Sequence, residues 1–333
     1  MDWNKGYTAR YFCSTIDPVT WKDVERFEII SGSINRTNSG LMESADLTCF
    51  KRHIQKEQWI RIYLDAKQDD SERVALFTGL ATSPDRRIDG LVEENPLACY
   101  SVLKPCEDVL LERGWYAQKG MDGAKLVERL LSRSTPAPIE VKPHSPALTN
   151  HIIAEDGESC LSMSQKILAA INWHLVIEGE GTIFVEPQSK EIVAKFDTFE
   201  NDTILPQIDY TDDWYECPNI LRTIVDDTAV VIVDDDDDSE LSTKRRGREV
   251  WAEETNVNLS EAESQITYTR RRLKELQSRS VEISYKRRYT PNIRVGDMIY
   301  LNYPKQGIQG DFTVMSQSIE LGYNAETTEK VQR

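Results

Sequence analysis

Four histidines and one run of aspartates are the residues of this 333-residue chain that could hold a metal ion. The histidines are His53, His144, His151 and His174. None has a second ligand at helical spacing and no HExxH motif is present, so we expect surface or packed histidines. Positions 234, 236 and 238 begin like a calcium loop, but Ser239 replaces the glycine needed at the sixth position. Arg245 also replaces the glutamate needed at the twelfth, which argues against calcium.

Motifs for covalent or phosphoryl chemistry are absent from the sequence. It has no P-loop, no GxGxxG after a strand and no GxSxG, and no local pattern suggests a Cys–His pair. The sequence therefore predicts no catalytic, cofactor-binding or metal-binding residues. A glycosidase needs two carboxylates about 5–9 Å apart, and a chain with 56 acidic residues leaves that possibility open. A cell-wall-degrading enzyme that uses a carboxylate pair is accordingly kept as an alternative.

The cysteines and the hydropathy pattern indicate assembly inside a cell. The six cysteines, which form no CxxC pair, are Cys13, Cys49, Cys99, Cys106, Cys160 and Cys217. We expect buried free thiols. The first ten residues lack the apolar segment of a secretory signal, and no run is long enough to span a membrane, so no membrane anchor is expected.

Charge is distributed unevenly along the chain. Residues 209–240 contain twelve acidic residues and one basic residue, which accounts for −11 of the net charge of −16. Such a surface repels nucleic acid. The basic run 244–248 could contact nucleic acid, but a turn that balances the neighbouring aspartates is the favoured interpretation. The seven tryptophans are dispersed and most lie in strand-like apolar context, which favours core packing over an exposed binding platform.

The C-terminal third has the clearest pattern of secondary structure. Strands are expected at 219–225, 229–233, 281–285, 298–303 and 312–319 from β-branched runs and alternation. A long amphipathic helix is expected at 260–277, opened by a capping box of Ser260 and Glu263. Its apolar stripe recurs at spacings of three and four: Leu259, Ala262, Ile266, Thr269, Leu273 and Leu276.

The rest of the chain is expected to be β-rich with small α/β parts. Residues 1–92 alternate strand-like runs with turns about every ten residues, as in a sandwich or barrel. Residues 93–205 mix helices at 121–133 and 159–172 with a hairpin, and four prolines make 134–150 an extended connector.

The segments DDDDDSELSTKRRGR, QSRSVEISYKRRYTPNIRVGDMIYL and GDFTVMSQSIELG, with the long helix among them, follow an unusual order. In this order the chain resembles the tail hub proteins of bacteriophages and related injection machines, the late control or baseplate hub family. The resemblance implies a mainly β fold with α+β insertions: a first tube-like barrel at 1–92, small α/β connecting domains at 93–205 and a second tube-like barrel at 206–333. It transfers no catalytic residue.

The function that the resemblance implies is structural. Three subunits would form a ring whose six barrels continue the tail tube, with phage DNA passing through without specific binding. Expected partners are the tail tube, distal tail, and tip, spike or tape-measure proteins. The protein would be assembled in the cytoplasm of the bacterial host and reside in the virion tail. A receptor- or carbohydrate-binding tail module is the second alternative.

Overall fold

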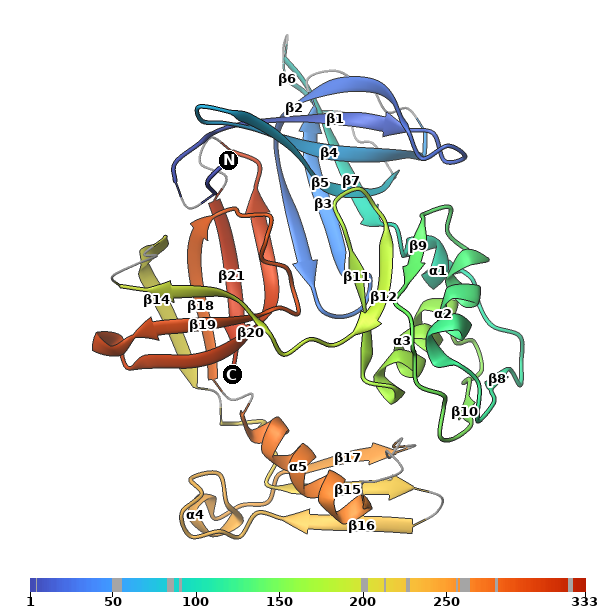
Figure 1. Ribbon diagram of the computed structural model, residues 1–333, viewed down its shortest axis with the longest axis vertical. Coiled ribbons are helices and arrows are strands. Elements are labelled where there is room, and N and C mark those ends of the chain that lie inside the picture. The colour runs from blue at the N-terminus through green and yellow to red at the C-terminus, as the bar shows by residue number, and fades with distance from the viewer. Residues whose placement is uncertain are drawn as a thin grey trace.

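Half of the chain lies in strands and 16% in helices, which form two barrels and two smaller units (Figure 1). The computed structural model describes residues 1–333 except positions 4, 50–55, 83–86, 90–91, 199–202, 213, 226–227, 256, 258–263, 279–280 and 323–325. The mainly β fold with α/β insertions expected from the sequence is confirmed.

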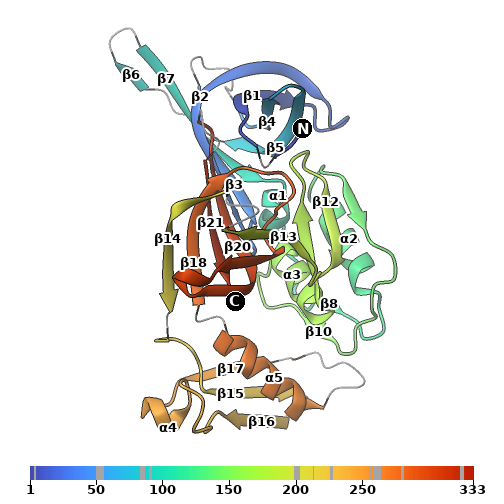
Figure 2. The same cartoon turned by 60° about the vertical axis from the view of Figure 1, so that its left-hand side comes forward.

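The first barrel closes on itself. Its strands, in spatial order, are β1 (Thr8–Ile16), β4 (Gln58–Lys67), β5 (Ser71–Thr82), β7 (Val92–Ser101), β3 (Glu43–Cys49) and β2 (Asp23–Thr37). Pairing of β2 with β1 completes the ring. Alternate residues of these strands point inward, and the interior is filled by a cluster that includes Ile34, Leu47, Ile62 and Phe77. The short β6 (Arg87–Asp89) pairs with β7 and extends beyond the barrel (Figure 2).

The second barrel is built from strands that are far apart in the sequence. In spatial order they are β13 (Ile192–Asp197), β19 (Met298–Tyr303), β20 (Ile308–Glu320), β21 (Glu326–Gln332), β18 (Val281–Arg288) and β14 (Ile204–Asp212). All six strands contribute to one apolar core, which contains Phe196, Ile204, Ile283, Leu301, Phe312 and Val331. In the described part of the chain no pairing joins β13 to β14, so these are the edge strands.

Two long strands join the barrels into one sheet of 13 strands. The start of β2 pairs with β1, whereas residues 33–37 of β2 pair with residues 316–320 of β20. The first half of β20 pairs instead with β19. Because each of these strands belongs to both barrels, the barrels cannot change their relative orientation without breaking backbone hydrogen bonds.

A small α/β unit is inserted between β7 and β13 and packs beside both barrels (Figures 1 and 2). Helices α2 (Gly123–Ser132) and α3 (Cys160–Ala170) cover a sheet of β11 (Trp173–Ile177), β12 (Ile183–Pro187) and β9 (Ile139–Val141). Asp122 and Ser159 cap the two helices by accepting hydrogen bonds from backbone N–H groups. The remaining elements of this unit are α1 (Lys104–Asp108), β8 (Tyr116–Ala117) and β10 (Ile152–Ile153).

A second unit is inserted between β14 and β18 and lies at the foot of the molecule (Figure 1). It contains β15 (Ile220–Val225), β16 (Thr228–Val233), α4 (Thr243–Arg246), β17 (Trp251–Thr255) and α5 (Gln265–Ser278). Helix α5 packs on one face of the sheet β16-β15-β17, where the Thr223 and Thr269 hydroxyl oxygens lie 2.7 Å apart.

These pairings correct the domain limits expected from the sequence. Strand β7 carries the first barrel to Ser101, beyond the expected end at 92. Strand β13 pairs with β19, so the second barrel begins before 206. The range 206–333 is also not one barrel, because the unit of β15, β16, β17 and α5 has its own sheet. Sequence order conceals this, because β13 and β18 each follow an insertion.

The long helix begins later than expected. Helix α5 starts at Gln265, and Ser264 Oγ accepts a hydrogen bond from Thr267 N, as an N-cap does. The expected capping box of Ser260 and Glu263 lies outside the described residues.

Candidate functional site at the joint between the barrels

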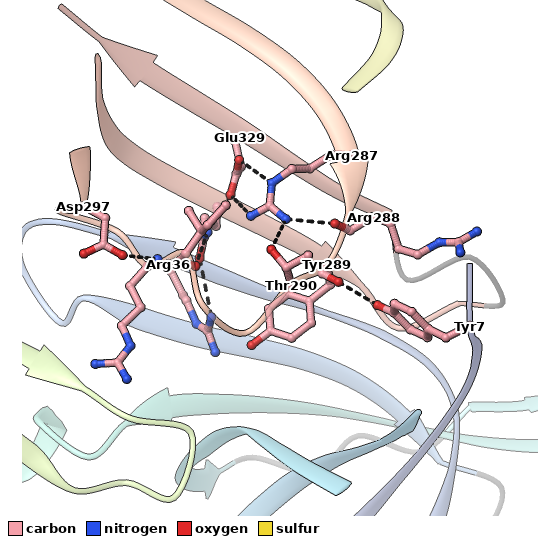
Figure 3. A network of polar contacts seen from close by, with 11 residues as sticks. Tyr7, Arg36, Arg287, Arg288, Tyr289, Thr290, Asp297 and Glu329 are labelled. Carbon is pink, nitrogen blue, oxygen red and sulfur yellow. Dashed lines mark hydrogen bonds and ion pairs between the residues drawn. The ribbon is translucent and has the colours of Figure 1, made fainter. Parts of the chain in front are cut away.

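A fully buried ion pair lies inside the second barrel. Arg287 on β18 and Glu329 on β21 are both completely covered, and their side chains make two hydrogen bonds of 2.7 and 2.6 Å (Figure 3). The remaining guanidinium nitrogen donates to Thr290 Oγ1 and to the Arg288 carbonyl. An ion pair this deep is tolerated only when its polar atoms are satisfied. Its two-point geometry fixes β18, β21 and the following loop relative to one another.

The ion pair is the centre of a network that reaches the first barrel. Gln317 on β20 donates to Glu329 Oε1 at 2.6 Å and to the Ile293 carbonyl at 2.9 Å. Arg36 on β2 donates to Gln317 Oε1 at 3.5 Å. The loop between β18 and β19 is therefore held by side chains of both barrels.

The same loop is also tied to the N-terminal segment. Tyr7 donates a hydrogen bond of 2.8 Å to the Tyr289 carbonyl, and the Arg288 guanidinium lies 5.3 Å from the Tyr7 ring (Figure 3). Tyr289 itself is buried in the core of the first barrel. The joint thus combines backbone pairing, an apolar contact and a buried polar network. Together these contacts fix the position of one barrel relative to the other.

The tip of the β11–β12 hairpin is wedged against the first barrel. Thr78 Oγ1 donates to the Gly179 carbonyl at 2.7 Å, and both Arg61 and Trp21 donate to the Glu180 carbonyl. Gly179 permits this approach because a Cβ there would lie 1.8 Å from the Ala75 carbonyl oxygen. The α/β unit is therefore docked rigidly on β4 and β5.

Burial shifts the pKa values of several groups around the joint. It raises the pKa of Glu43, at the start of β3, to about 8, although Arg36 opposes the shift. Burial also raises the pKa of Asp297 and lowers that of His174, which lies 3.8 Å from Glu186. The phenol of Tyr285, which faces Glu329, has its pKa raised well above its ordinary value by burial.

We expect the variant Glu43→Gln to become more stable than the unmodified protein as pH rises. The unfolded carboxyl ionises near its model value of 4.5 and the folded one near 8, so ionisation opposes folding progressively between these pH values. The slope is at most about 1.4 kcal/mol per pH unit. Melting temperatures from pH 5 to 9 should diverge through this window and run parallel above it. A constant difference, or the same divergence for the exposed Glu140→Gln, would contradict the assignment.

The residues singled out for metal chemistry do not converge. His144 is exposed, His151 packs edge-on against Tyr116, and His174 is half-buried. His53 lies outside the described residues. Among the residues the structure describes, no three His, Cys, Asp or Glu side chains are grouped to hold a metal ion. No helix in the same part of the chain is long and apolar enough to cross a membrane.

The acidic and basic runs form one turn. Lys244 pairs with Asp237 at 3.2 Å, and Arg245 donates to the Asp237 carbonyl. Arg246 donates to the carbonyls of Trp214 and Cys217. The interpretation of the basic run as a turn that balances the aspartates is confirmed only for Lys244, because Arg245 and Arg246 donate to backbone carbonyls and the run forms the short helix α4.

The cysteine prediction is also confirmed, whereas the tryptophan prediction is partly wrong. All six cysteines are buried free thiols. Trp59 and Trp173 are buried, but Trp214 is 49% and Trp251 is 55% exposed. Trp251 lies on the exposed face of its three-stranded sheet, and α5 covers the other face. The apolar sequence around Trp251 does not indicate which of the two faces α5 covers.

The network residues Arg36, Arg287, Gln317 and Glu329 were missed at the sequence level. One signal was present: Ile283, Tyr285 and Arg287 alternate, which places the arginine on the buried face of its strand. An arginine on a core face requires a buried acid as partner, but its position 42 residues later could not be found from periodicity.

Neither a family model nor a curated protein sequence matches this chain. Similarity appears at the level of solved structures. A tail protein from Neisseria meningitidis matches with a TM-score of 0.71 and 15% identity, covering 97% of this chain and 96% of the other. The 43 kDa tail protein of prophage MuSo2 from Shewanella oneidensis matches with a TM-score of 0.68 and 12% identity over 99% and 98% of the two chains.

More distant similarities extend to another kind of machine. A type VI secretion component of E. coli, described as similar to tail proteins of bacteriophage T4, matches with a TM-score of 0.52 and 9% identity over 92% of this chain and 73% of the other. The chain therefore has the fold of these phage tail proteins over nearly its whole length. The resemblance stated from the sequence is confirmed at the level of fold.

Proposed function

We propose that this protein is a structural hub of a phage tail or of a related injection machine. The observation that carries the proposal is the match to whole tail proteins, which includes both barrels and both insertions. A shared domain alone would say less, because one fold serves many functions.

The joint suits this role. In the proposed assembly three subunits form a ring, and the two barrels of each subunit occupy successive positions around a channel. Such a ring closes only if the angle between the barrels is constant, since heterologous contacts otherwise generate open arrays. The shared strands β2 and β20 and the network of Arg36, Gln317, Glu329 and Arg287 supply that constancy.

The neighbours in the machine would be tail components. The tail tube or distal tail protein would bind one face of the ring, and a tip, spike or tape-measure protein the other. Electron microscopy of the purified protein tests the ring directly. We expect class averages with six lobes around a central hole; a population of separate, unringed particles at high protein concentration would contradict the proposal.

The acidic stretch is proposed to line the channel in part, where it would keep DNA from adhering. Asp235, Asp236, Asp238 and Glu240 are exposed, as are Asp209 and Asp212 on β14. Reversing Asp235, Asp236 and Asp238 to lysine should slow or stop DNA ejection while the ring still forms. Ejection from particles that carry the variant can be followed with a DNA-binding dye. Normal ejection would contradict this placement, and conversion of the same residues to asparagine is the matched control.

A binding role is the second candidate, and one observation favours it. Trp214, Tyr215 and Trp251 are 49%, 73% and 55% exposed on the small unit that contains α5. Exposed aromatic rings are the surfaces on which sugars and partner proteins pack. Binding of the purified protein to host cells or a glycan panel, lost in Trp251→Ala, would support this role. Turnover of peptidoglycan would instead support the enzymatic alternative.

A further inference from the structure

Helix α5 covers one face of the sheet β16-β15-β17 (Figure 1), and the other face is open to solvent. Because Thr223 of β15 contacts α5 and side chains alternate along a strand, its neighbours Arg222 and Ile224 point to the open face. The register of β16 and β17 with β15 places alternate residues of both strands on that face as well. We call it the outer face, and its exposed side chains are Arg222, Val231, Val233, Trp251 and Glu253.

The outer face carries an aromatic ring that is held in place. Trp251 is 55% exposed, and its indole N–H donates a hydrogen bond of 3.0 Å to Glu249 Oε2, which fixes the orientation of the ring. A ring that is already ordered loses little conformational entropy when a ligand packs on it. Val231 and Val233 are 43% and 45% exposed on the opposite edge strand. Apolar side chains that gather on a surface in this way mark a binding surface.

The centre of the outer face is polar and accessible. Arg222 and Glu253 are register partners on adjacent strands, and their side chains form an ion pair while remaining 44% and 45% exposed. The guanidinium group donates hydrogen bonds and the carboxylate accepts them. A hydroxyl group both donates and accepts. The pair therefore offers a partner for each function of a hydroxyl group beside the aromatic ring.

The size and the charge of the outer face limit what it can bind. With strands about 4.8 Å apart and a rise of about 3.3 Å per residue, the sheet presents roughly 250 Å². A stable protein interface needs about 800 Å² on each partner, so the outer face alone is too small for a second copy of this chain. The charges of Arg222 and Glu253 cancel, and Glu249 and the aspartates at 234–238 belong to the same unit. Polyanions such as nucleic acid are repelled by these carboxylates.

We propose that the outer face binds a neutral glycan chain. One sugar ring packs on Trp251, because the C–H groups of the sugar carry slight positive charge and the face of an aromatic ring is negative. Hydroxyl groups of the chain form hydrogen bonds with Arg222 and Glu253, and the chain continues across the sheet toward Val231. Glycan binding of this kind rests on the binding role named above as the second candidate, and it does not require the ring.

Isothermal titration calorimetry on the full chain tests the outer face. The probes are the neutral pentasaccharides cellopentaose, maltopentaose and N-acetylchitopentaose, the monosaccharides glucose and N-acetylglucosamine, and heparin as a polyanion. We expect at least one pentasaccharide to bind, and to bind at least tenfold tighter than its monosaccharide, because only a chain reaches both Trp251 and the ion pair. Equal affinity of the chain and the single sugar would contradict a site for a glycan chain.

Variants assign the binding to the outer face. Trp251→Ala should weaken pentasaccharide binding at least tenfold, and Trp251→Phe should weaken it less, since a phenyl ring keeps a surface for stacking. Arg222→Met removes the donors and should also weaken binding. Trp214→Ala is the matched control, because Trp214 is 49% exposed on the same unit but precedes β15 and lies outside the sheet. Melting temperatures check that each variant is folded.

The remaining outcomes separate the glycan from other occupants. Glycan binding is overturned if no pentasaccharide binds, if Trp251→Ala binds as tightly as the unmodified protein, or if only heparin binds. Loss of self-association in Trp251→Ala would make the outer face a subunit interface instead. Binding to host cells that requires Trp251, without binding of any pentasaccharide, would keep the binding role and exclude a neutral glycan. We expect the mass of the assembly to be the same in Trp251→Ala, so failure of glycan binding leaves the ring unaffected.

Discussion

Replacing Glu329 by alanine is expected to lower the free energy of unfolding by about 3–5 kcal/mol, because it leaves a charged Arg287 buried without its partner. The change also removes the acceptor of the 2.6 Å hydrogen bond from Gln317, which connects the ion pair to the first barrel. The loss should appear as a lower urea midpoint, followed by circular dichroism. We also expect faster proteolysis in the loop at 289–297, which this network anchors.

Two controls distinguish lost charge pairing from lost packing. Glu329→Gln keeps the shape and should lose less stability than alanine. The double variant Arg287→Met with Glu329→Leu removes both charges and should recover most of the loss, as replacement of buried ion pairs by apolar residues often does. If Glu329→Ala unfolds at the same urea concentration as the unmodified protein, the network does not hold the joint.

Replacing Gly179 by alanine should destabilise the docking of the α/β unit by about 1–3 kcal/mol or more, the usual range for overpacking. The new Cβ would stand 1.8 Å from the Ala75 carbonyl oxygen, which is a backbone atom and cannot rotate away. The hairpin tip must therefore shift, and the hydrogen bonds from Thr78, Arg61 and Trp21 to its carbonyls weaken.

Thermal unfolding and hydrogen exchange at β5 measure this effect. Gly322→Ala is the matched control, since a Cβ there meets no atom within 4 Å and the backbone is not left-handed. We expect Gly322→Ala to be nearly neutral. Equal behaviour of the two alanine variants would show that the hairpin is not wedged against the barrel.

The elements that follow local rules could be predicted from the sequence. Helix 121–133 was expected from its apolar stripe, and α2 (Gly123–Ser132) occupies it. The alternation at 281–285 likewise predicted β18. The contact of Lys244 with the run of aspartates follows from charge alone, because adjacent carboxylates repel one another and attract nearby cations.

The joint could not be predicted in the same way. It depends on β2 pairing with β20, whose partner residues are separated by nearly the whole chain. Periodicity shows which face of a strand is buried, but not which strand lies beside it. The sequence therefore predicts the α5 unit to be part of the second barrel, because the strands of this unit are followed directly along the chain by β18. The prediction that Trp251 is buried is wrong because the sheet face that becomes buried is decided by where α5 packs.

In the proposed hub, three copies of this chain assemble into a ring. Light scattering after size-exclusion chromatography measures the mass in solution most directly. We expect a species with the mass of three chains of 38.2 kDa each, stable on dilution. A single species of 38.2 kDa at every concentration would contradict a self-assembling ring and favour the binding and enzymatic alternatives.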